Sequence, residues 1–247
     1  MLLAFLSDIH ANLEALHAVL RFLRRKPIRH WVILGDHVGY GANPNEVLKT
    51  VLRLRPKTII RGNHDRVAAG IDNIEGFNEI AADAALWTQQ RLSPYHRSVL
   101  RHLPVGPISF DGVINISHGC PLDEDAYVLS DYDAYVSFRE TSEPLLFFGH
   151  THLPVIYRLR DDVVDTFRLP PARKVTGRLD RRFRYMINPG SVGQPRDHIP
   201  YASFCLFNLK TWTITFYRIP YAIDTAQSKI LRAGLPAFLA HRLAHGI

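Results

Sequence analysis

Hydrophobic positions in the first sixty residues follow two patterns, which predict two kinds of element. Three short apolar runs without a helical period are typical of buried strands, at 2–7, 31–34 and 57–61. Two stretches between them carry apolar residues at helical spacing, at 12–26 and 43–53. Pro27 ends the first helix, and Asn43 followed by Pro44 opens the second. Because strands and helices that alternate in this way are typical of a parallel sheet, we predict an α/β arrangement here.

After the third strand, the pattern predicts a helical excursion over about residues 70–105. Its helices are expected at 77–92 and 94–102, and they either cap a cleft or form a side layer. Short apolar runs separated by turns follow, with no helical pattern between them. These runs predict a second, largely antiparallel sheet with strands at 107–110, 113–117, 145–148, 155–159, 185–188, 202–209 and 211–218. A final helical region begins near Asp224 and is broken near Gly234 and Pro236.

Length and composition fit one globular domain over residues 1–247. The chain is 47% hydrophobic and 21% charged, which excludes a disordered protein. No stretch reaches the roughly 18 apolar residues of a membrane-spanning helix, and residues 1–6 lack the features of an export signal. The two cysteines, Cys120 and Cys205, are too few for a disulfide framework. We therefore expect a cytoplasmic protein without membrane partners.

The charge balance favours anionic partners. Lys and Arg outnumber Asp and Glu by 30 to 23, which gives a net charge of +7. The chain also contains 13 histidines, and histidine is both the commonest metal ligand and the usual acid or base near neutral pH. The position of these histidines relative to the carboxylates therefore decides what chemistry the chain can perform.

Polar clusters follow the predicted strands, where α/β folds bind their ligands. They contain two aspartates, one asparagine and four histidines as candidate metal ligands: Asp8, His10, Asp36, Asn63, His118, His150 and His152. A mixed oxygen and nitrogen donor set suits Mn, Fe, Co, Ni or Zn, and it argues against Ca. Because seven donors exceed the needs of one tetrahedral ion, we expect two divalent ions that share a carboxylate, with Mn²⁺ as the first expectation.

In this order and spacing, the clusters resemble those of the calcineurin-like metallophosphoesterase superfamily. The motifs are Asp8-x-His10, Gly35-Asp36, Gly62-Asn63-His64-Asp65, His118 and Gly149-His150-x-His152. The phrases at 7–16, 35–41 and 188–196 resemble the small bacterial and archaeal branch of that superfamily. The resemblance implies a four-layer α-β-β-α sandwich, in which two mixed β-sheets pack face to face with helices outside.

The resemblance also implies a role for each motif residue. Asp8, His10 and His152 would hold one metal, while Asn63, His118 and His150 would hold the other. Asp36 would bridge the two ions, and a hydroxide between them would attack phosphorus in line with the leaving oxygen. His64 would contact the phosphate or protonate the leaving group, and Asp65 would fix the tautomer of that imidazole.

Three residues near these motifs are candidate substrate contacts. Asn12 either contacts phosphate or caps the helix that follows it. Arg196 suits bidentate binding of phosphate oxygens, although an arginine on a loop is also often solvated. His37 follows Asp36 where relatives more often have an apolar or acidic residue, and it either approaches the substrate or supports the site from behind. Ala11 stands where many relatives have glycine.

The roles of two further segments stay open. The stretch 168–184 carries seven basic residues, which either attract a nucleic acid or decorate a solvated hairpin: Arg168, Arg173, Lys174, Arg178, Arg181, Arg182 and Arg184. In the helical excursion, Trp87, Tyr95 and His96 are the side chains most able to stack on a base.

These observations predict a binuclear metal-dependent phosphoesterase that hydrolyses phosphodiester or phosphomonoester bonds. The expected substrate is a small phosphate-containing molecule or nucleotide, and this branch of the superfamily often forms homo-oligomers. A dinucleoside polyphosphate hydrolase, a nuclease and a protein serine/threonine phosphatase are alternatives within the enzyme class. A non-catalytic metal-binding scaffold is the alternative from another class, because some proteins of this fold bind partners without turnover.

Overall fold

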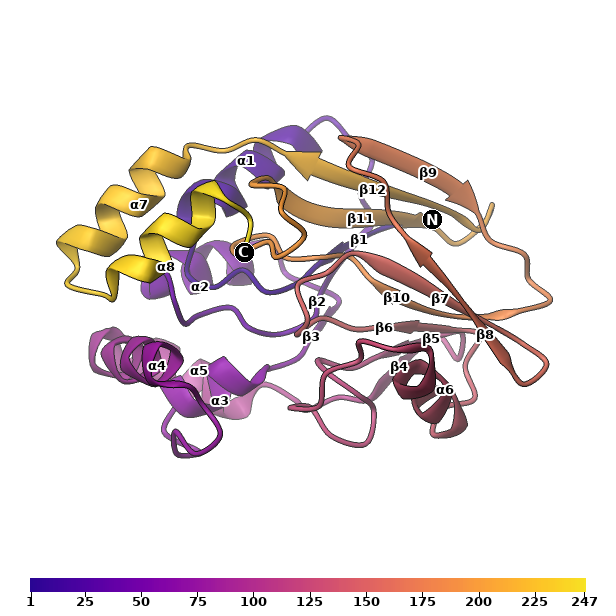
Figure 1. Ribbon diagram of the computed structural model, residues 1–247, viewed down its shortest axis with the longest axis horizontal. Coiled ribbons are helices and arrows are strands. Elements are labelled where there is room, and N and C mark those ends of the chain that lie inside the picture. The colour runs from indigo at the N-terminus through magenta and orange to yellow at the C-terminus, as the bar shows by residue number, and fades with distance from the viewer.

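Strands from both ends of the chain form the first of two sheets in the computed structural model, which describes residues 1–247. The strand order is β3-β2-β1-β11-β12-β9 (Figure 1). The strands are β1 (Leu2–Leu6), β2 (His30–Ile33), β3 (Thr58–Ile59), β9 (Lys174–Arg178), β11 (Ala202–Asn208) and β12 (Thr213–Ile219). β1, β2 and β3 are parallel, as their pattern predicts, whereas β11 pairs antiparallel with β1 and sets Cys205 opposite Phe5.

The second sheet has the order β4-β5-β6-β10-β7-β8. Its strands are β4 (Ile108–Phe110), β5 (Ile114–Ile116), β6 (Leu145–Phe147), β7 (Val155–Arg160), β8 (Val163–Arg168) and β10 (Arg184–Asn188). The expectation of a largely antiparallel sheet is confirmed only in part. β4–β5, β10–β7 and β7–β8 pair antiparallel, whereas β5, β6 and β10 are parallel neighbours. The helix α6 (Asp131–Arg139) connects β5 to β6, and such a crossover returns the chain in the same direction. Both sheets are therefore mixed.

Three hydrophobic layers hold this arrangement together. The largest cluster fills the space between the sheets, where the rings of Phe5 on β1 and Phe147 on β6 stack 3.6 Å apart. A second cluster joins the first sheet to α1 (Leu13–Leu23) and α2 (Pro44–Arg53). A third joins the second sheet to α6. The resulting order of helices, sheet, sheet and helix confirms the four-layer α-β-β-α sandwich (Figure 1).

Local sequence explains where the main helices begin. The side chain of Asn12 accepts a hydrogen bond from the backbone N–H of Ala15, which caps α1. Pro44 occupies the first turn of α2, where its missing N–H costs nothing. Ser130 and Asp133 form a reciprocal capping box at the start of α6.

The helical excursion lies beside the sandwich and contains α4 (Glu79–Arg91) and α5 (Pro94–His102) after the short α3 (Asn63–Ala68). α4 packs against the C-terminal helices α7 (Ile223–Arg232) and α8 (Ala237–His241), which precede a 3₁₀ turn at Arg242–Ala244. α5 packs against α2 and α3. The excursion is thus mainly a side layer (Figure 1), and none of the helices has the length and apolar character needed to span a membrane.

The basic stretch 168–184 forms the end of β8, the edge strand β9 and the turn before β10. Its members are mostly exposed, but Arg184 donates hydrogen bonds to the carbonyl oxygens of Phe138 and Thr141 and so anchors the end of α6. Arg182 pairs with Asp180 at 2.6 Å. Arg184 therefore serves the fold, while Arg182 and most of the other basic residues are exposed.

Candidate metal centre

The seven candidate ligands come from the ends of five strands and meet at one edge of the sandwich. Asp8 and His10 follow β1, Asp36 follows β2, and Asn63 opens α3 after β3. His118 follows β5, while His150 and His152 follow β6. All seven are at most 7% exposed, so the site is built from buried polar groups contributed by both sheets.

Glycines allow the strand ends to approach this closely. A Cβ at Gly149 would collide with the side chain of Ser7, and one at Gly62 would collide with the Asp36 carboxylate. Gly35 has a positive φ of 95°, and a Cβ there would lie 2.7 Å from His118 Nδ1. The glycines of the motifs are therefore explained by close packing around the candidate ligands.

Five of the candidate ligands have a left-handed backbone. Their φ angles are 52° at Asp8, 48° at His10, 50° at Asp36, 65° at His150 and 61° at His152. Such angles are sparsely populated outside glycine, cost about 1–3 kcal/mol each, and cluster at functional sites. Backbone hydrogen bonds hold the loops in place, including His10 N–H to Asp36 O at 2.9 Å. The fold thus maintains an unfavourable backbone conformation at the candidate ligands.

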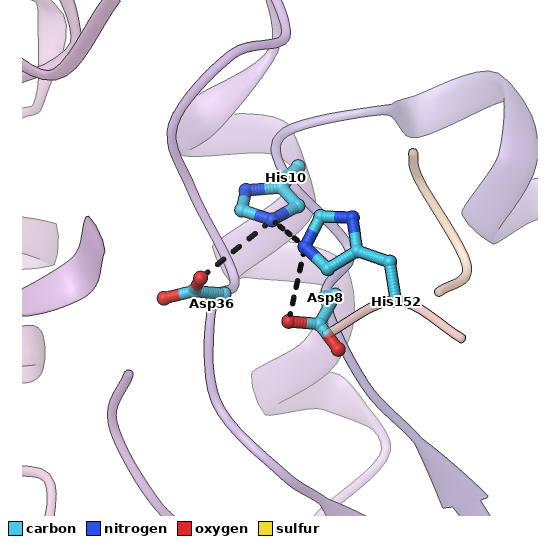
Figure 2. A group of neighbouring side chains, drawn as sticks. All are labelled: Asp8, His10, Asp36 and His152. Carbon is cyan, nitrogen blue, oxygen red and sulfur yellow. Dashed lines mark hydrogen bonds and ion pairs between the residues drawn. The ribbon is translucent and has the colours of Figure 1, made fainter. Parts of the chain in front are cut away.

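The first donor group contains Asp8, His10, Asp36 and His152, whose ligand atoms all lie within 4.8 Å of one another (Figure 2). His10 Nε2 lies 3.0 Å from His152 Nε2 and 3.6 Å from Asp36 Oδ2. His152 Nε2 lies 3.4 Å from Asp8 Oδ1. Each of these donor atoms points toward the common centre of the group.

The tautomers of His10 and His152 make this group suitable for a cation. His10 Nδ1 lies 3.1 Å from Val38 O, and His152 Nδ1 lies 2.6 Å from Gln194 O, so each Nδ1–H donates to a carbonyl oxygen. Burial holds the pKa of both imidazoles well below the usual range, so both rings are neutral. Two Nε2 lone pairs therefore face each other at 3.0 Å, an arrangement that a metal ion stabilises.

The second donor group contains Asp36, His118 and His150, and Asn63 adjoins it. His118 Nε2 lies 3.4 Å from Asp36 Oδ2 and 3.3 Å from Asn63 Oδ1. His118 Nδ1 lies 2.7 Å from Leu34 O, which orients the ring with Nε2 toward the other donors. Asp36 belongs to both groups, so its carboxylate is placed between them. The donor chemistry and the geometry fit divalent metal ions.

The charge interactions of His118 and Asp8 also favour a cation at the candidate site. Burial lowers the pKa of His118, but the facing Asp36 carboxylate outweighs it and raises the pKa to about 10. In the first donor group, burial raises the pKa of Asp8 to about 7, against the opposing effect of the nearby His118 charge. A proton on His118 thus balances the buried carboxylates, and a metal cation at the same place would replace that proton.

The expected contact between Asp65 and His64 is wrong. Asp65 Oδ2 instead lies 2.7 Å from His37 Nδ1, and the same carboxylate accepts hydrogen bonds from the backbone N–H groups of His37, Val38 and Gly62. His64 Nδ1 is buried without a hydrogen-bond partner, and the backbone N–H of His64 donates to Asp36 Oδ1 at 3.0 Å. Asp65 therefore joins two ligand-bearing loops and does not orient His64.

His37 and Asn12 both make hydrogen bonds within the protein. His37 is fully buried, and its Nδ1 lies 2.7 Å from Asp65 Oδ2. Asn12 is 4% exposed, and its side chain caps α1 and donates to Gly193 O at 2.8 Å. Both residues support the site from within the protein, and a substrate contact by either stays a prediction.

Arg196 lies beside the first donor group. Its positive charge further lowers the pKa of His152, which burial already lowers. One guanidinium nitrogen donates to Gln194 Oε1 at 3.1 Å, whereas Nε is buried without a partner. Arg196 and Thr151 also line a groove of about 540 Å³. A phosphate contact by Arg196 stays a prediction.

The aromatic residues near the site differ from those expected in the helical excursion. Trp87 donates to Ala233 O in the packing of α4 against the C-terminal helices, and Tyr95 is 67% exposed on α5. The ring of His96 lies 2.8 Å from Asn45 Oδ1. Three aromatic rings that the sequence did not single out lie against candidate site histidines instead: Tyr40, Phe77 and Tyr127. Nothing in their local patterns distinguishes them from core or surface aromatics.

A two-sheet sandwich with Asp and His donors at its edge defines a metallophosphoesterase fold, and the comparison with known proteins agrees. The family model of the calcineurin-like phosphoesterase superfamily domain matches residues 1–212. The chain therefore belongs to the calcineurin-like phosphoesterase superfamily, as the motifs indicate. Members of this superfamily are generally hydrolases.

Individual relatives match the chain over its whole length. A crystal structure of a metallophosphoesterase from Sphaerobacter thermophilus has a TM-score of 0.86 and 36% identity, and covers 100% of this chain and 99% of that one. The uncharacterized protein MJ0912 of Methanocaldococcus jannaschii is 37% identical, over 99% of this chain and 98% of its own length. The hypothetical protein PH1004 of Pyrococcus horikoshii shares the fold, with a TM-score of 0.79, 22% identity, and 100% and 98% coverage.

Proposed function

We propose that the protein is a binuclear metal-dependent phosphoesterase that hydrolyses phosphodiester or phosphomonoester bonds. The observation that carries the proposal is the pair of neutral imidazoles whose Nε2 atoms face each other at 3.0 Å beside two carboxylates. This arrangement is unfavourable without a cation, and it adjoins a second donor group that shares Asp36. Mn²⁺ is the preferred candidate, and Fe, Zn, Co and Ni suit the same donors.

Each residue has a role in the proposed reaction. Asp8, His10 and His152 would hold one ion, Asn63, His118 and His150 would hold the other, and both ions would share Asp36. Bound ions of this kind polarise phosphoryl oxygens and supply a nucleophile at neutral pH. His64 lines the cavity beside the donors and would contact the phosphate or protonate the leaving oxygen. Arg196 adds a positive charge that favours an anionic substrate.

Hydrolysis of a chromogenic phosphodiester and of the matching monoester tests the proposal. Metal-stripped protein is assayed with and without Mn²⁺, and Asp36→Asn is compared with Asp162→Asn, which changes an exposed aspartate. We expect Mn²⁺-dependent turnover that Asp36→Asn lowers more than about hundredfold, because even residues behind the ligands usually contribute about 10–100-fold. Absence of turnover with every candidate metal, in protein that binds two ions, would instead favour a non-catalytic scaffold.

A further inference from the structure

A cavity of about 150 Å³ opens directly beside the metal centre and is lined by aromatic rings and amide groups. Asn63, His64 and His150 of the candidate site form part of its wall. Most of the rest of the wall comes from two loops, 73–78 before α4 and 125–127 after β5. A substrate whose phosphate lies at the donors would therefore extend one of its substituents into this cavity.

The aromatic rings in the cavity lie against the candidate site histidines. The centroid of Phe77 lies 4.7 Å from that of His64, and Tyr40 lies 4.4 Å from His64 on the same wall. The ring of Tyr127 lies 4.2 Å from His150. Tyr127 is 49% exposed, so part of its ring is available to a ligand. Rings in such positions offer stacking surfaces for another planar group.

Polar groups in the same wall add hydrogen-bonding capacity. Asn73, Glu75 and Asn78 line the cavity and are exposed, so their amide and carboxylate groups are accessible to a ligand. Amide and carboxylate side chains match the donor and acceptor edges of nucleobases. The volume lies below the roughly 300–1,000 Å³ of pockets that enclose drug-sized ligands, which favours a single ring system over a peptide.

We infer that this cavity binds the base of a nucleoside phosphate ester, with Phe77 and Tyr127 as the specificity-determining residues. The inference rests on the proposed function, since the phosphate must lie at the metal centre. The base stacks on the two rings, and its edge hydrogen-bonds to Asn73, Glu75 or Asn78. The neighbouring Arg66 fixes both loops, because it pairs with Asp72 on one and with Glu124 and Asp125 on the other.

Two probes that differ only in the base provide the test: adenosine 5′-monophosphate and ribose 5-phosphate. Their inhibition constants are measured against hydrolysis of a chromogenic diester by Mn²⁺-loaded protein. Saturation-transfer NMR on the diamagnetic Zn²⁺-loaded protein reports contact with the adenine protons independently of turnover. We expect the adenine nucleotide to bind at least about fivefold more tightly, the lower end of what one stacked base contributes.

Variants of the cavity rings distinguish a loss of base stacking from a general loss of ligand binding. Tyr127→Leu and Phe77→Leu are expected to abolish the preference for the adenine nucleotide and to weaken adenine saturation transfer, while ribose 5-phosphate binds as before. Tyr95→Leu, which removes an exposed ring outside the cavity, is expected to change neither probe. Equal binding of both probes by the unchanged protein would overturn the inference, as would an equal loss of both in the variants.

Failure of the proposed phosphoesterase function can be distinguished from failure of the inference about the base. If no metal supports hydrolysis of either the diester or the matching monoester, the phosphoesterase proposal fails, whereas adenine saturation transfer still reports on the cavity. If hydrolysis is Mn²⁺-dependent but the two probes bind equally, only the inference about the base fails.

Discussion

Asp8 and His118 would make the binding of the proposed metal ions dependent on pH. The pKa of Asp8 is raised to about 7 by burial, so this side chain is mainly protonated at pH 6. The pKa of His118 is about 10, because Asp36 outweighs the effect of burial, so its ring carries a proton throughout the neutral range. A metal ion must displace these protons, and affinity therefore rises with pH.

We expect the affinity for Mn²⁺ to rise about tenfold per pH unit for each proton displaced, and most steeply below pH 7, where both groups are protonated. Calorimetry at pH 6 and pH 8, in two buffers that differ in ionisation enthalpy, measures both the affinity and the number of protons released. A constant affinity without proton release would contradict this expectation.

Replacing Asp65 is expected to destabilise the protein strongly. Its carboxylate accepts hydrogen bonds from three backbone N–H groups and from the ring of His37, all of them buried. Asp65→Ala leaves these donors without partners, which costs about 3–5 kcal/mol for a buried charged network. Urea unfolding measures the change in the free energy of unfolding, with Asp162→Ala as the exposed control. A loss below about 1 kcal/mol would show that the network contributes little.

At the residue scale, the sequence predicted which side chains converge and failed on which histidine pairs with Asp65. The donors are predictable because each one directly follows a recognisable strand. The partner of Asp65 is not, since His37 and His64 both lie next to candidate ligands in the chain. The path of the loop after β2 places His37 in the interior. The pattern of apolar and polar residues along the chain does not predict that path.

Arg66 on α3 is the connection between the two loops that flank the metal centre. Its guanidinium lies 2.8 Å from Asp72 and 2.5 Å from Asp125, and it also pairs with Glu124. Arg66→Met keeps the apolar stem but removes all of these ion pairs. We expect hydrogen exchange in 70–78 and 123–127 to speed up by about tenfold or more, which corresponds to about 1.4 kcal/mol.

Arg182→Met is the matched control, because Arg182 is 79% exposed and pairs only with Asp180. Mass spectrometry resolves exchange in the two loops separately from that in the sheets. Exchange rates in both loops that stay the same in Arg66→Met would show that the loops are held by other contacts.

Elements with a strong apolar period were predictable, and those without one were missed. α3 has only six residues and presents Asn, His and Asp in its first turn, so no helical stripe marks it. β8 and β9 lie at sheet edges and are largely exposed, which removes the buried face that makes a strand recognisable. α6 did carry a signal, the spacing of Ser130 and Asp133, which the apolar pattern alone does not reveal.

The two sheets are held together by a continuous apolar core, and Phe5 lies in it. Its ring is fully buried and stacks on Phe147 across the sheets. Phe5→Ala is expected to cost about 3–5 kcal/mol through lost burial and the cavity left behind. Phe167→Ala, in which the replaced ring is 42% exposed, should cost much less. Urea unfolding of both variants tests this, and equal losses would contradict the importance of the inter-sheet contact.

At the scale of the whole molecule, the sequence predicted the order of helix and sheet layers but not which strands belong to which sheet. The runs at 202–209 and 211–218 were expected in the second sheet, because they follow its other strands along the chain. β11 and β12 instead return to the first sheet and pair beside β1. Alternation of apolar and polar residues shows that a strand has a buried face, and it carries no information about its neighbours.

The left-handed backbone at five candidate ligands also bears on how this protein would respond to artificial selection. Glycine adopts such angles without the steric penalty that other residues meet, and asparagine tolerates them better than most. A library screened only for heat resistance should therefore accumulate glycine or asparagine at Asp8, His10, Asp36, His150 and His152. The same variants would forfeit metal binding. Selection of a more heat-stable variant of this protein therefore requires a screen for activity in every round.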